Sequence, residues 1–268
     1  GFTFKKGLGQ NFLTARNILE EIVDAAEIES GVIEVGPGFG VLTSELAQNS
    51  DKVVTIEIDE RLIDVLDYTL AEYDNVKIIN EDILKLDLKK VIDDEFNGEK
   101  VSIAANLPYY ITTPIITKLL EEKLPIKNIV VMVQKEVAER MSAKPSTKDY
   151  GAITVLCQYY TEPSIVANVP ASLFVPPPKV DSAVLKLKVL DKPSVEVKDE
   201  GVFFRVVKAA FSQRRKTLLN CLSANFPIPK DEISTLLESI GIAPSRRGET
   251  LSLEEFANIA DTLLQKIK

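Results

Sequence analysis

Short apolar runs alternate with helix-spaced segments along the first 190 residues, and this alternation constrains the fold more than any other feature. The apolar runs predict strands at Val32–Val35, Val53–Ile58, Val76–Ile79, Val101–Ala105, Ile129–Val133, Ile153–Tyr160 and Ala183–Val189. Segments with helical spacing lie between them at Leu42–Gln48, Leu62–Leu70, Ile115–Leu120 and Glu136–Met141. Strands that alternate with helices predict an α/β fold, in which helices cover both faces of a parallel sheet.

The pattern changes after about Leu190. Asp191–Ser194 has the composition of a linker, and the remaining segments have helical spacing at Phe203–Phe211, Thr217–Ser223, Glu232–Ser239 and Leu253–Leu264. Prolines and glycines fall in the gaps between these segments, as expected for loops. We therefore predict two domains, an α/β domain over residues 1–190 and a small all-helical domain over residues 191–268.

The composition excludes several kinds of site. The chain has no histidine, which excludes histidine bases, Ser-His-Asp triads and histidine metal ligands. Cys157 and Cys221 lack the paired spacing of zinc sites or redox dithiols, so we expect no metal and two buried thiols in a reducing cytoplasm. No apolar run approaches the roughly 18 to 20 residues that span a bilayer. The first residues lack the apolar core of a signal peptide, so we expect a cytoplasmic protein with no membrane partner.

Charge is distributed unevenly over the two predicted domains. The net charge is −8, which argues against a simple nucleic-acid binder. From Gly201 onward, however, ten Lys and Arg residues stand against seven Asp and Glu residues, a net charge of +3. This region holds two basic clusters, so it predicts a phosphate-binding face on an otherwise acidic protein. The candidate residues are Arg214, Arg215, Lys216, Arg246 and Arg247.

A glycine-rich loop, Gly36-Pro37-Gly38-Phe39-Gly40, follows the first predicted strand and opens a helix. Its third glycine comes one residue earlier than in the dinucleotide fingerprint. Glu57 ends the second strand, where an acidic residue bonds ribose hydroxyls, and Asp82 follows the third, where a carboxylate can accept from an adenine amino group. The loop is typical of S-adenosylmethionine rather than NAD, and an acidic lining suits the sulfonium cation.

Asn106-Leu107-Pro108-Tyr109 follows the fourth predicted strand and therefore lies at the sheet edge where ligands bind. The Asn106 amide offers an acceptor and two donors. Pro108 fixes the backbone beside it, and Tyr109 supplies a flat face. Together these groups can hold the amino group of a planar base, although four such residues alone also fit an ordinary turn after a strand.

Taken together, these segments resemble the ribosomal RNA adenine dimethyltransferases, and most closely the bacterial small-subunit branch of that family. The resemblance covers nearly the whole chain and rests on eight segments. They are Gly9–Leu13, Glu34–Gly40, Glu57–Asp59, Glu81–Ile83, Asn106–Tyr110, the proline loop Phe174–Val180, a predicted helix at Phe211–Leu218, and Ser245–Leu251.

The resemblance implies a seven-stranded, Rossmann-like class I methyltransferase domain followed by a helical domain that binds RNA and the ribosome. It implies S-adenosyl-L-methionine as the cofactor and S-adenosyl-L-homocysteine as the product. It also implies methyl transfer to N6 of two adjacent adenosines near the 3′ end of 16S rRNA within the 30S subunit, with a role in subunit biogenesis. We expect a monomer. The cofactor contacts that it implies are Asn11, Leu13, Gly36, Gly38, Glu57, Asp82 and Asn106.

We further expect Asn106 Oδ1 and the Leu107 carbonyl to accept hydrogen bonds from the adenine amino group, so that no strong base is needed. Tyr109 and Phe174 are expected to stack on the two faces of the extruded base, although core packing is the alternative for Phe174. Three other functions remain open. They are a large-subunit rRNA methyltransferase of the antibiotic-resistance branch, a non-catalytic RNA-binding relative, and an NAD-dependent oxidoreductase, which the glycine spacing disfavours.

Overall fold

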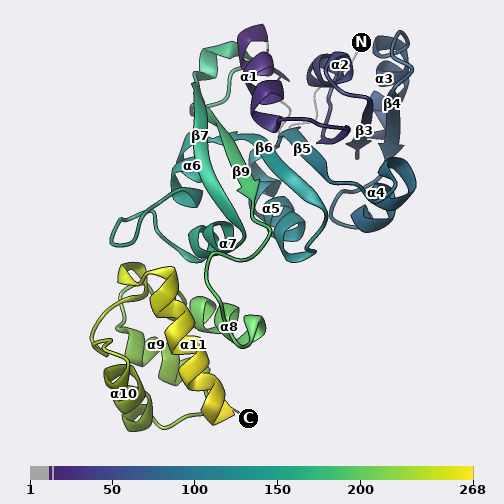
Figure 1. Ribbon diagram of the computed structural model, residues 1–268. Coiled ribbons are helices and arrows are strands. Elements are labelled where there is room, and N and C mark those ends of the chain that lie inside the picture. The colour runs from purple at the N-terminus through teal and green to yellow at the C-terminus, as the bar shows by residue number, and fades with distance from the viewer. Residues whose placement is uncertain (1–11, 14, 268) are drawn as a thin grey trace. The chain divides into compact units, whose positions relative to one another are not determined.

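The computed structural model describes residues 12, 13 and 15–267 (Figure 1). The chain divides into two compact units, each described by itself below. The first unit comprises residues Gly1–Ala138 and Glu162–Leu190, and the second comprises Glu139–Thr161 and Asp191–Lys268. Within the described residues, no helix combines the length and the apolar character that a membrane span requires.

A seven-stranded sheet forms the centre of the first unit. Its strand order is β4-β3-β2-β5-β6-β9-β7, and the strands are β2 (Gly31–Val35), β3 (Lys52–Glu57), β4 (Val76–Asn80), β5 (Val101–Asn106), β6 (Ile126–Gln134), β7 (Thr161–Val169) and β9 (Ser182–Val189). The five strands β4, β3, β2, β5 and β6 are parallel, as predicted, whereas β9 is antiparallel to β6. No α-helix lies between β7 and β9, and parallel strands need such a crossover. The sheet is therefore mixed, and the prediction of a parallel sheet is wrong for β9.

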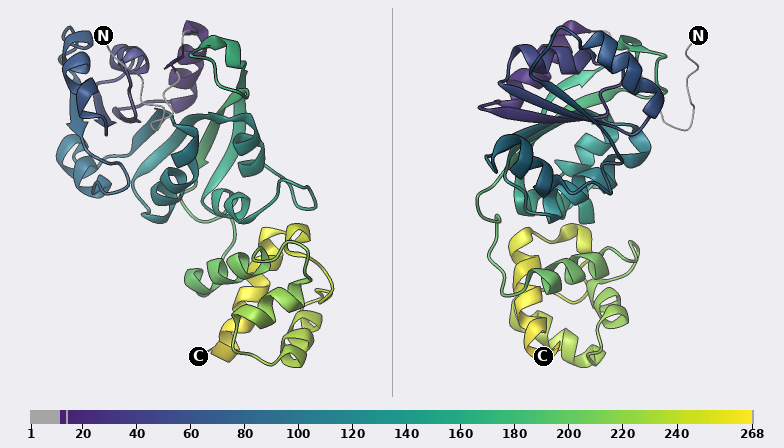
Figure 2. Two further views of the ribbon diagram at one scale, coloured as in Figure 1. Left: turned by 180° about the vertical axis from the view of Figure 1, so that it is seen from behind. Right: turned by 90° about the vertical axis from the view of Figure 1, so that its right-hand side faces the viewer.

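Helices cover both faces of this sheet (Figure 2). They are α1 (Arg16–Ala26), α2 (Val41–Gln48), α3 (Ile63–Thr69), α4 (Leu88–Phe96), α5 (Thr112–Glu121) and α6 (Lys135–Met141). The buried sides of α1 and α2 pack on one face, against Val32, Val53 and Ala104. On the opposite face the Phe96 ring of α4 lies over Gly31, where a Cβ atom would come within 2.2 Å of the ring. Glycine at the start of β2 thus lets α4 approach the sheet.

The predicted strand at Ile153–Tyr160 is instead a helix, α7 (Ala152–Tyr160). Short, continuously apolar runs cannot be assigned to strand or helix by periodicity alone. The seventh strand is β7, which begins at the next residue and whose middle residues are mostly exposed. β7 is an edge strand and contains Pro163, which central strands exclude. An exposed, polar edge strand lacks the apolar signal on which the prediction depended.

The second unit is helical, and its later helices agree with the prediction. They are α8 (Glu200–Ala210), α9 (Leu218–Asn225), α10 (Lys230–Ser239) and α11 (Leu253–Ile267), and α7 joins them. Residues 139–161, which we expected in the first domain, belong to this unit, because Tyr150, Val155 and Tyr159 are buried in one cluster with Phe203 and Phe256. The second stretch of this unit begins at Asp191.

The predicted helix at Phe211–Leu218 is also wrong, because α8 ends at Ala210 and α9 begins only at Leu218. Turns connect the two helices, with the Ser212 amide donating to the Ala209 carbonyl at 3.0 Å. Thr217 then caps α9 by accepting from the Asn220 amide. The cap is the last residue but one of the segment, so nearly all of Phe211–Leu218 is the connection between two helices.

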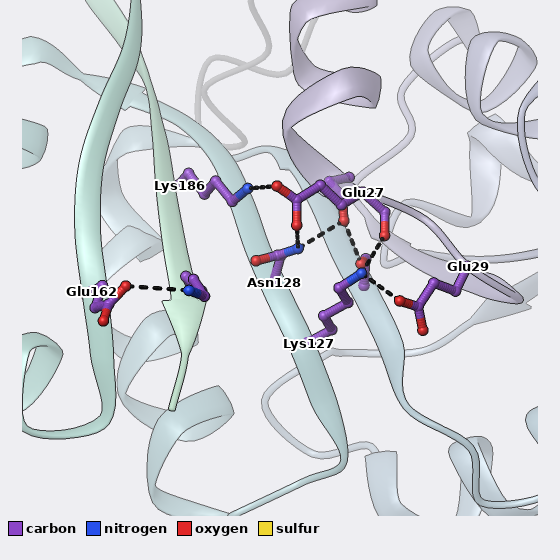
Figure 3. A network of polar contacts seen from close by, with 9 residues as sticks. Glu27, Glu29, Lys127, Asn128, Glu162 and Lys186 are labelled. Atoms are coloured by element: carbon purple, nitrogen blue, oxygen red, sulfur yellow. Dashed lines mark hydrogen bonds and ion pairs between the residues drawn. The ribbon is translucent and has the colours of Figure 1, made fainter. Parts of the chain in front are cut away.

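A polar network anchors the end of α1 at the amino ends of β5 and β6 (Figure 3). The buried Asn128 amide donates to the Ala26 carbonyl at 3.0 Å and to Glu27 at 3.3 Å. Lys186 pairs with Glu27 at 2.5 Å, and Lys127 pairs with Glu29 at 2.6 Å. These contacts hold α1 to the sheet at the edge opposite to Asn106, which ends β5.

Candidate active site

One cavity of about 140 Å³ lies at the carboxyl ends of β2, β3 and β5, beside the turn that follows β4. In an open α/β sheet this edge is the expected position of a ligand. The structure brings together every predicted catalytic and cofactor-binding residue that it describes. The residues lining the cavity include Leu13, Gly36, Gly38, Glu57, Asp82, Asn106, Leu107, Pro108, Tyr109 and Phe174. Asn11 lies outside the described residues.

The glycine loop turns sharply beside the cavity. Gly36, Gly38 and Gly40 have φ angles of 69°, 58° and 84°, in the left-handed region that favours glycine. The Gly36 amide donates to the Ile56 carbonyl at 2.9 Å, which fixes the loop to the end of β3. A Cβ atom on Gly40 would lie 3.1 Å from Leu70 Cδ2. Glycine is therefore required at these positions by the positive φ angles. At Gly40 it is also required because a side chain would contact Leu70.

Two carboxylates line the cavity at the ends of adjacent strands. Glu57 is 5% exposed, and its Oε1 accepts from the Asp59 amide at 2.8 Å. Burial raises the pKa of the Glu57 carboxyl, and hydrogen bonds from backbone amides oppose this effect. Asp82 is half-buried, and its Oδ1 accepts from the Leu84 amide at 3.0 Å. Both carboxylates are therefore held in place by the turns that follow their strands.

The Asn106 segment forms the wall next to the glycine loop. The Leu107 amide donates to the Met132 carbonyl of β6 at 3.2 Å, and the Leu107 side chain is buried. The Pro108 carbonyl accepts from the Ile111 amide at 3.2 Å and from Thr112 Oγ1 at 3.3 Å, so it is committed to the turn into α5. Among the described residues we find no donor paired with the Leu107 carbonyl. That carbonyl is thus available for the accepting role expected of it.

Tyr109 and Phe174, the two aromatic residues assigned to the base, line the same cavity. The Tyr109 hydroxyl lies 2.8 Å from Ser182 Oγ, and burial raises the pKa of the phenol, so it is neutral at neutral pH. Phe174 is 3% exposed, and it stands opposite Leu13 in the small antiparallel pair of β1 (Phe12–Leu13) and β8 (Phe174–Val175). It belongs to the buried apolar cluster on the α1 face as well as to the cavity lining. Core packing accounts for its burial, and stacking on a base remains a prediction.

Glu34 lines the cavity too, although sequence reasoning gave it no role beyond its motif. It is 1% exposed, and its Oε2 accepts from Thr43 Oγ1 of α2 at 2.5 Å and from Thr55 Oγ1 of β3 at 3.2 Å. Burial raises the pKa of the Glu34 carboxyl to about 7. This single side chain therefore joins β2, β3 and α2 around the glycine loop.

The sequence reasoning also missed apolar residues of the lining. Ile58 and Ile83 each follow a strand-end carboxylate directly, and Ile58 is 53% exposed. Tyr110, beside Tyr109, is 59% exposed. Apolar side chains in the wall of a cavity suit the faces of a planar base. The available signal was their position, one residue after Glu57, Asp82 or Tyr109.

The basic residues of the second unit have two different environments. Arg214, Arg215 and Lys216 are exposed in the turns between α8 and α9, and Arg247 is exposed as well. Arg246, in contrast, makes an ion pair with Glu255 through both terminal nitrogens, with Nη2 2.9 Å from Oε2. Its Nη2 also donates to the Thr250 carbonyl at 2.7 Å. Arg246 is therefore half-buried and holds its own loop, whereas the other four basic residues are exposed.

A loop that the sequence reasoning did not select lies beside these residues. The Arg214 guanidinium donates to the Lys148 carbonyl, and the Ser146 amide donates to the Glu249 carbonyl at 2.7 Å. Lys144 and Lys148 of this loop are exposed. Three segments distant in sequence thus form one basic surface in the second unit. We define this basic surface as Lys144, Lys148, Arg214, Arg215, Lys216 and Arg247.

The polar and apolar groups that line the cavity fit S-adenosylmethionine. The carboxylates of Glu57 and Asp82 and the amide of Asn106 bring acceptor oxygens to the cavity. Ile58 and Ile83 supply apolar surface. In the part of the chain that the structure describes, no group of three or more His, Cys, Asp or Glu side chains is placed to hold a metal ion. Cys157 and Cys221 are both buried as free thiols.

A mixed seven-stranded sheet with a glycine loop and acidic strand ends at its carboxyl edge defines the class I S-adenosylmethionine-dependent methyltransferases. Comparison with known families is more specific. The model of the family described as ribosomal RNA adenine dimethylase matches residues 1–265. The chain belongs to this family, and it is an rRNA methyltransferase.

Individual relatives agree with this assignment. Proteins named ribosomal RNA small subunit methyltransferase A from Bacillus mycoides (strain KBAB4) and Bacillus cereus (strain B4264) are 56% identical over 98% of this chain and 92% of their own length. The crystal structure of a dimethyladenosine transferase from Plasmodium falciparum is 30% identical, with a TM-score of 0.78 over 92% of this chain and 95% of that chain. The 23S rRNA methyltransferase ErmE is 27% identical, with a TM-score of 0.72 over 95% of this chain and 100% of that chain.

Proposed function

We propose that the protein transfers methyl groups from S-adenosylmethionine to N6 of two adjacent adenosines near the 3′ end of 16S rRNA in the 30S subunit, giving N6-dimethyladenosine. The observation that carries this proposal is the convergence of the ten described site residues on one cavity. The choice of the small subunit is supported by 56% identity to small-subunit enzymes, against 27% to the large-subunit enzyme ErmE.

The cofactor is held by the acidic and glycine-rich side of the cavity. When bound, S-adenosylmethionine supplies an electrophilic methyl group. Glu57 would accept from the ribose hydroxyls and Asp82 from the adenine amino group, while Ile58 and Ile83 would cover the apolar faces of the adenine. The positive φ angles of Gly36 and Gly38 let the backbone approach closely. Leu13 completes the apolar lining.

The substrate nitrogen is positioned by Asn106 and Leu107. The exocyclic nitrogen of adenine is a weak nucleophile because its lone pair is delocalised into the ring. Hydrogen bonds to Asn106 Oδ1 and to the Leu107 carbonyl favour a pyramidal nitrogen and stabilise the positive charge that develops on it. Positioning of this kind can lower the barrier by several kcal/mol. A strong base is therefore unnecessary, in keeping with a chain that has no histidine.

The base itself is held by aromatic rings. An adenosine in a folded RNA has to leave its stack to reach the cavity, at a cost of a few kcal/mol. Stacking on an aromatic side chain returns about 1–3 kcal/mol per base. We assign one face of the base to Tyr109, and the other to Phe174 after a small displacement from its buried position.

The RNA partner is bound through the basic surface of the second unit. This assignment keeps Arg214, Arg215, Lys216 and Arg247 from the sequence prediction, adds Lys144 and Lys148, and gives Arg246 a structural role. Because the remainder of the chain is acidic, we propose that binding needs a structured 30S particle rather than naked RNA. We also propose that the protein acts as a cytoplasmic monomer during small-subunit biogenesis.

The test is transfer of labelled methyl groups to undermethylated 30S particles, 50S particles and naked 16S rRNA, followed by nucleoside analysis. Dimethyladenosine in 30S particles alone supports the proposal, whereas activity on 50S particles assigns the protein to the resistance branch. Transfer to neither, with cofactor binding retained, indicates a non-catalytic relative. Methylation of naked 16S rRNA as fast as of 30S particles contradicts the need for a structured subunit.

Asn106→Ala, assayed beside the wild type, tests the catalytic assignment. We expect a loss of at least about 100-fold in turnover, which is the low end of the effect of removing a positioned polar group. The matched control is Asn49→Ala, an exposed asparagine at the end of α2 that should leave turnover unchanged. A loss below about 10-fold in the Asn106 variant would remove that residue from the mechanism.

A further inference from the structure

Ser182, the first residue of β9, makes a side-chain contact with Tyr109 of the cavity lining. Its Oγ lies 2.8 Å from the Tyr109 hydroxyl, and its side chain is fully buried. Ser182 does not itself line the cavity, whereas Tyr109 does. The serine therefore contacts the hydroxyl end of the Tyr109 side chain without being part of the cavity lining.

The backbone around Ser182 is held from two sides. Ser182 pairs with Gln134 in the antiparallel ladder of β6 and β9, and the carbonyl of Asp181 accepts from the Lys135 amide at 3.0 Å. Asp181 Oδ1 accepts from the Ala171 amide at 2.9 Å. A hydrogen-bond partner fixed in this way restricts the side chain that it binds much more than a mobile partner does.

The same two residues connect both aromatic walls of the cavity. Ala171 begins the helical turn Ala171–Leu173, which leads directly into Phe174. Asp181 therefore closes the loop that carries Phe174, and Ser182 binds the phenol of Tyr109. Asp181 and Ser182, at the start of β9, thus help to set the positions of the Tyr109 and Phe174 rings. The proposed function places the substrate base between these two rings.

We propose that Ser182 is a positioning residue for methyl transfer, which fixes the position of the Tyr109 ring so that the adenine meets it in the place needed for reaction. This inference rests on the proposed function, because it concerns the residues assigned to the base. Small errors in the orientation of a bound group reduce rate more than affinity, since positioning acts on the transition state. The predicted effect of losing Ser182 is thus on kcat rather than on KM.

The experiment is a double-mutant cycle on the full-length chain, with Ser182→Ala, Tyr109→Phe and the double variant assayed on undermethylated 30S particles. Each single change should lower kcat about 3- to 10-fold, the loss that corresponds to one neutral hydrogen bond, with KM for the particle changed less than about 2-fold. The double variant should be no worse than either single variant, because both changes remove the same contact.

Ser102→Ala is the matched control. Ser102 is a buried serine of the same sheet, and its hydroxyl donates to the Ala26 carbonyl at 2.6 Å near the amino end of β5. Its loss should lower thermal stability and leave kcat unchanged. Equal losses of kcat in the Ser102 and Ser182 variants, or additive losses in the cycle, would overturn the inference in favour of a general structural role.

A second measurement does not depend on activity. In spectra of the protein with 13C-labelled tyrosine rings, the Tyr109 signals are those missing from Tyr109→Phe. Ser182→Ala should shift these signals and speed the ring flips, and unchanged signals would overturn the inference. If Ser182→Ala alters the Tyr109 signals but the wild type methylates no rRNA, the proposed function fails and the contact between Ser182 and the ring stands.

Discussion

Replacing Glu34 by glutamine should change how the free energy of unfolding depends on pH. Glu34 is 1% exposed, and burial raises its pKa from 4.5 to about 7 in the folded protein. The folded state therefore holds its proton more tightly than the unfolded state does. The associated stability is fully present below pH 4.5, is lost as the pH rises from 4.5 to about 7, and does not return above that range. Glutamine keeps an acceptor for Thr43 and Thr55 but cannot ionise.

The size of the effect follows from the two pKa values. One pKa unit corresponds to about 1.4 kcal/mol, so the full change is about 3 kcal/mol. Between pH 5 and pH 8 the wild type should lose about 2–3 kcal/mol relative to Glu34→Gln, because part of the change lies below pH 5. This is a large fraction of the typical stability of a domain.

The assay is urea unfolding of both proteins at several pH values between 5 and 8. The quantity compared is the difference between their free energies of unfolding, because the contributions of all groups that titrate identically in the two proteins cancel in this difference. Glu60→Gln removes an exposed carboxylate near the end of β3, and it reports the effect of changing net charge alone. A difference between wild type and Glu34→Gln that changes by less than about 1 kcal/mol over this range would refute a buried carboxyl that ionises near neutral pH.

Three further predictions concern the loop, the fold of the second unit and RNA binding. Gly40→Ala should destabilise the protein by about 1–3 kcal/mol more than Gly241→Ala in thermal unfolding, because both glycines have positive φ angles but only Gly40 has a neighbour within 3.1 Å of the added Cβ. Arg246→Ala should lower the free energy of unfolding by about 2 kcal/mol, because it removes the bonds to Glu255 and Thr250. Arg247→Ala should leave the free energy of unfolding unchanged and weaken binding to 30S particles. Lys144→Ala combined with Lys148→Ala should reduce the salt dependence of 30S binding by about one to two phosphate contacts, while the exposed pair Lys192→Ala and Lys230→Ala, with the same loss of charge, should not.

The sequence predicted the sheet well where strands are buried on both faces. β2, β3, β5 and β6 read as continuous apolar runs because helices cover them on each side. The same rule misassigned Ile153–Tyr160, since a short helix buried in the second unit has an equally continuous apolar run. The strand that occupies the seventh position of the sheet is β7. Most of its residues are exposed, so its sequence has no continuous apolar run from which a strand could be predicted.

Residues that line the cavity could be predicted where the local sequence has a distinctive chemical pattern. Gly36, Gly38, the strand-end carboxylates and the Asn-Leu-Pro-Tyr turn carry local signals, and all of them line the cavity. Contacts between distant segments leave no such signal. The bonds of Ser182 to Tyr109, of Glu34 to Thr55 and of Arg246 to Glu255 depend on tertiary structure, and sequence reasoning accordingly missed the first two and gave Arg246 to RNA.

The helical unit is assembled from two stretches of chain, residues 139–161 and 191–268. The first stretch is therefore synthesised well before the residues with which it packs. Tyr150, Val155 and Tyr159 leave the ribosome well before Phe203 and Phe256, with which they are buried in the finished protein. Until α8 to α11 have been synthesised, the cluster that buries these side chains is incomplete. Nascent or truncated chains that end near Leu190 therefore display an aromatic surface, which chaperones and proteases can use to distinguish an unfinished molecule from a finished one.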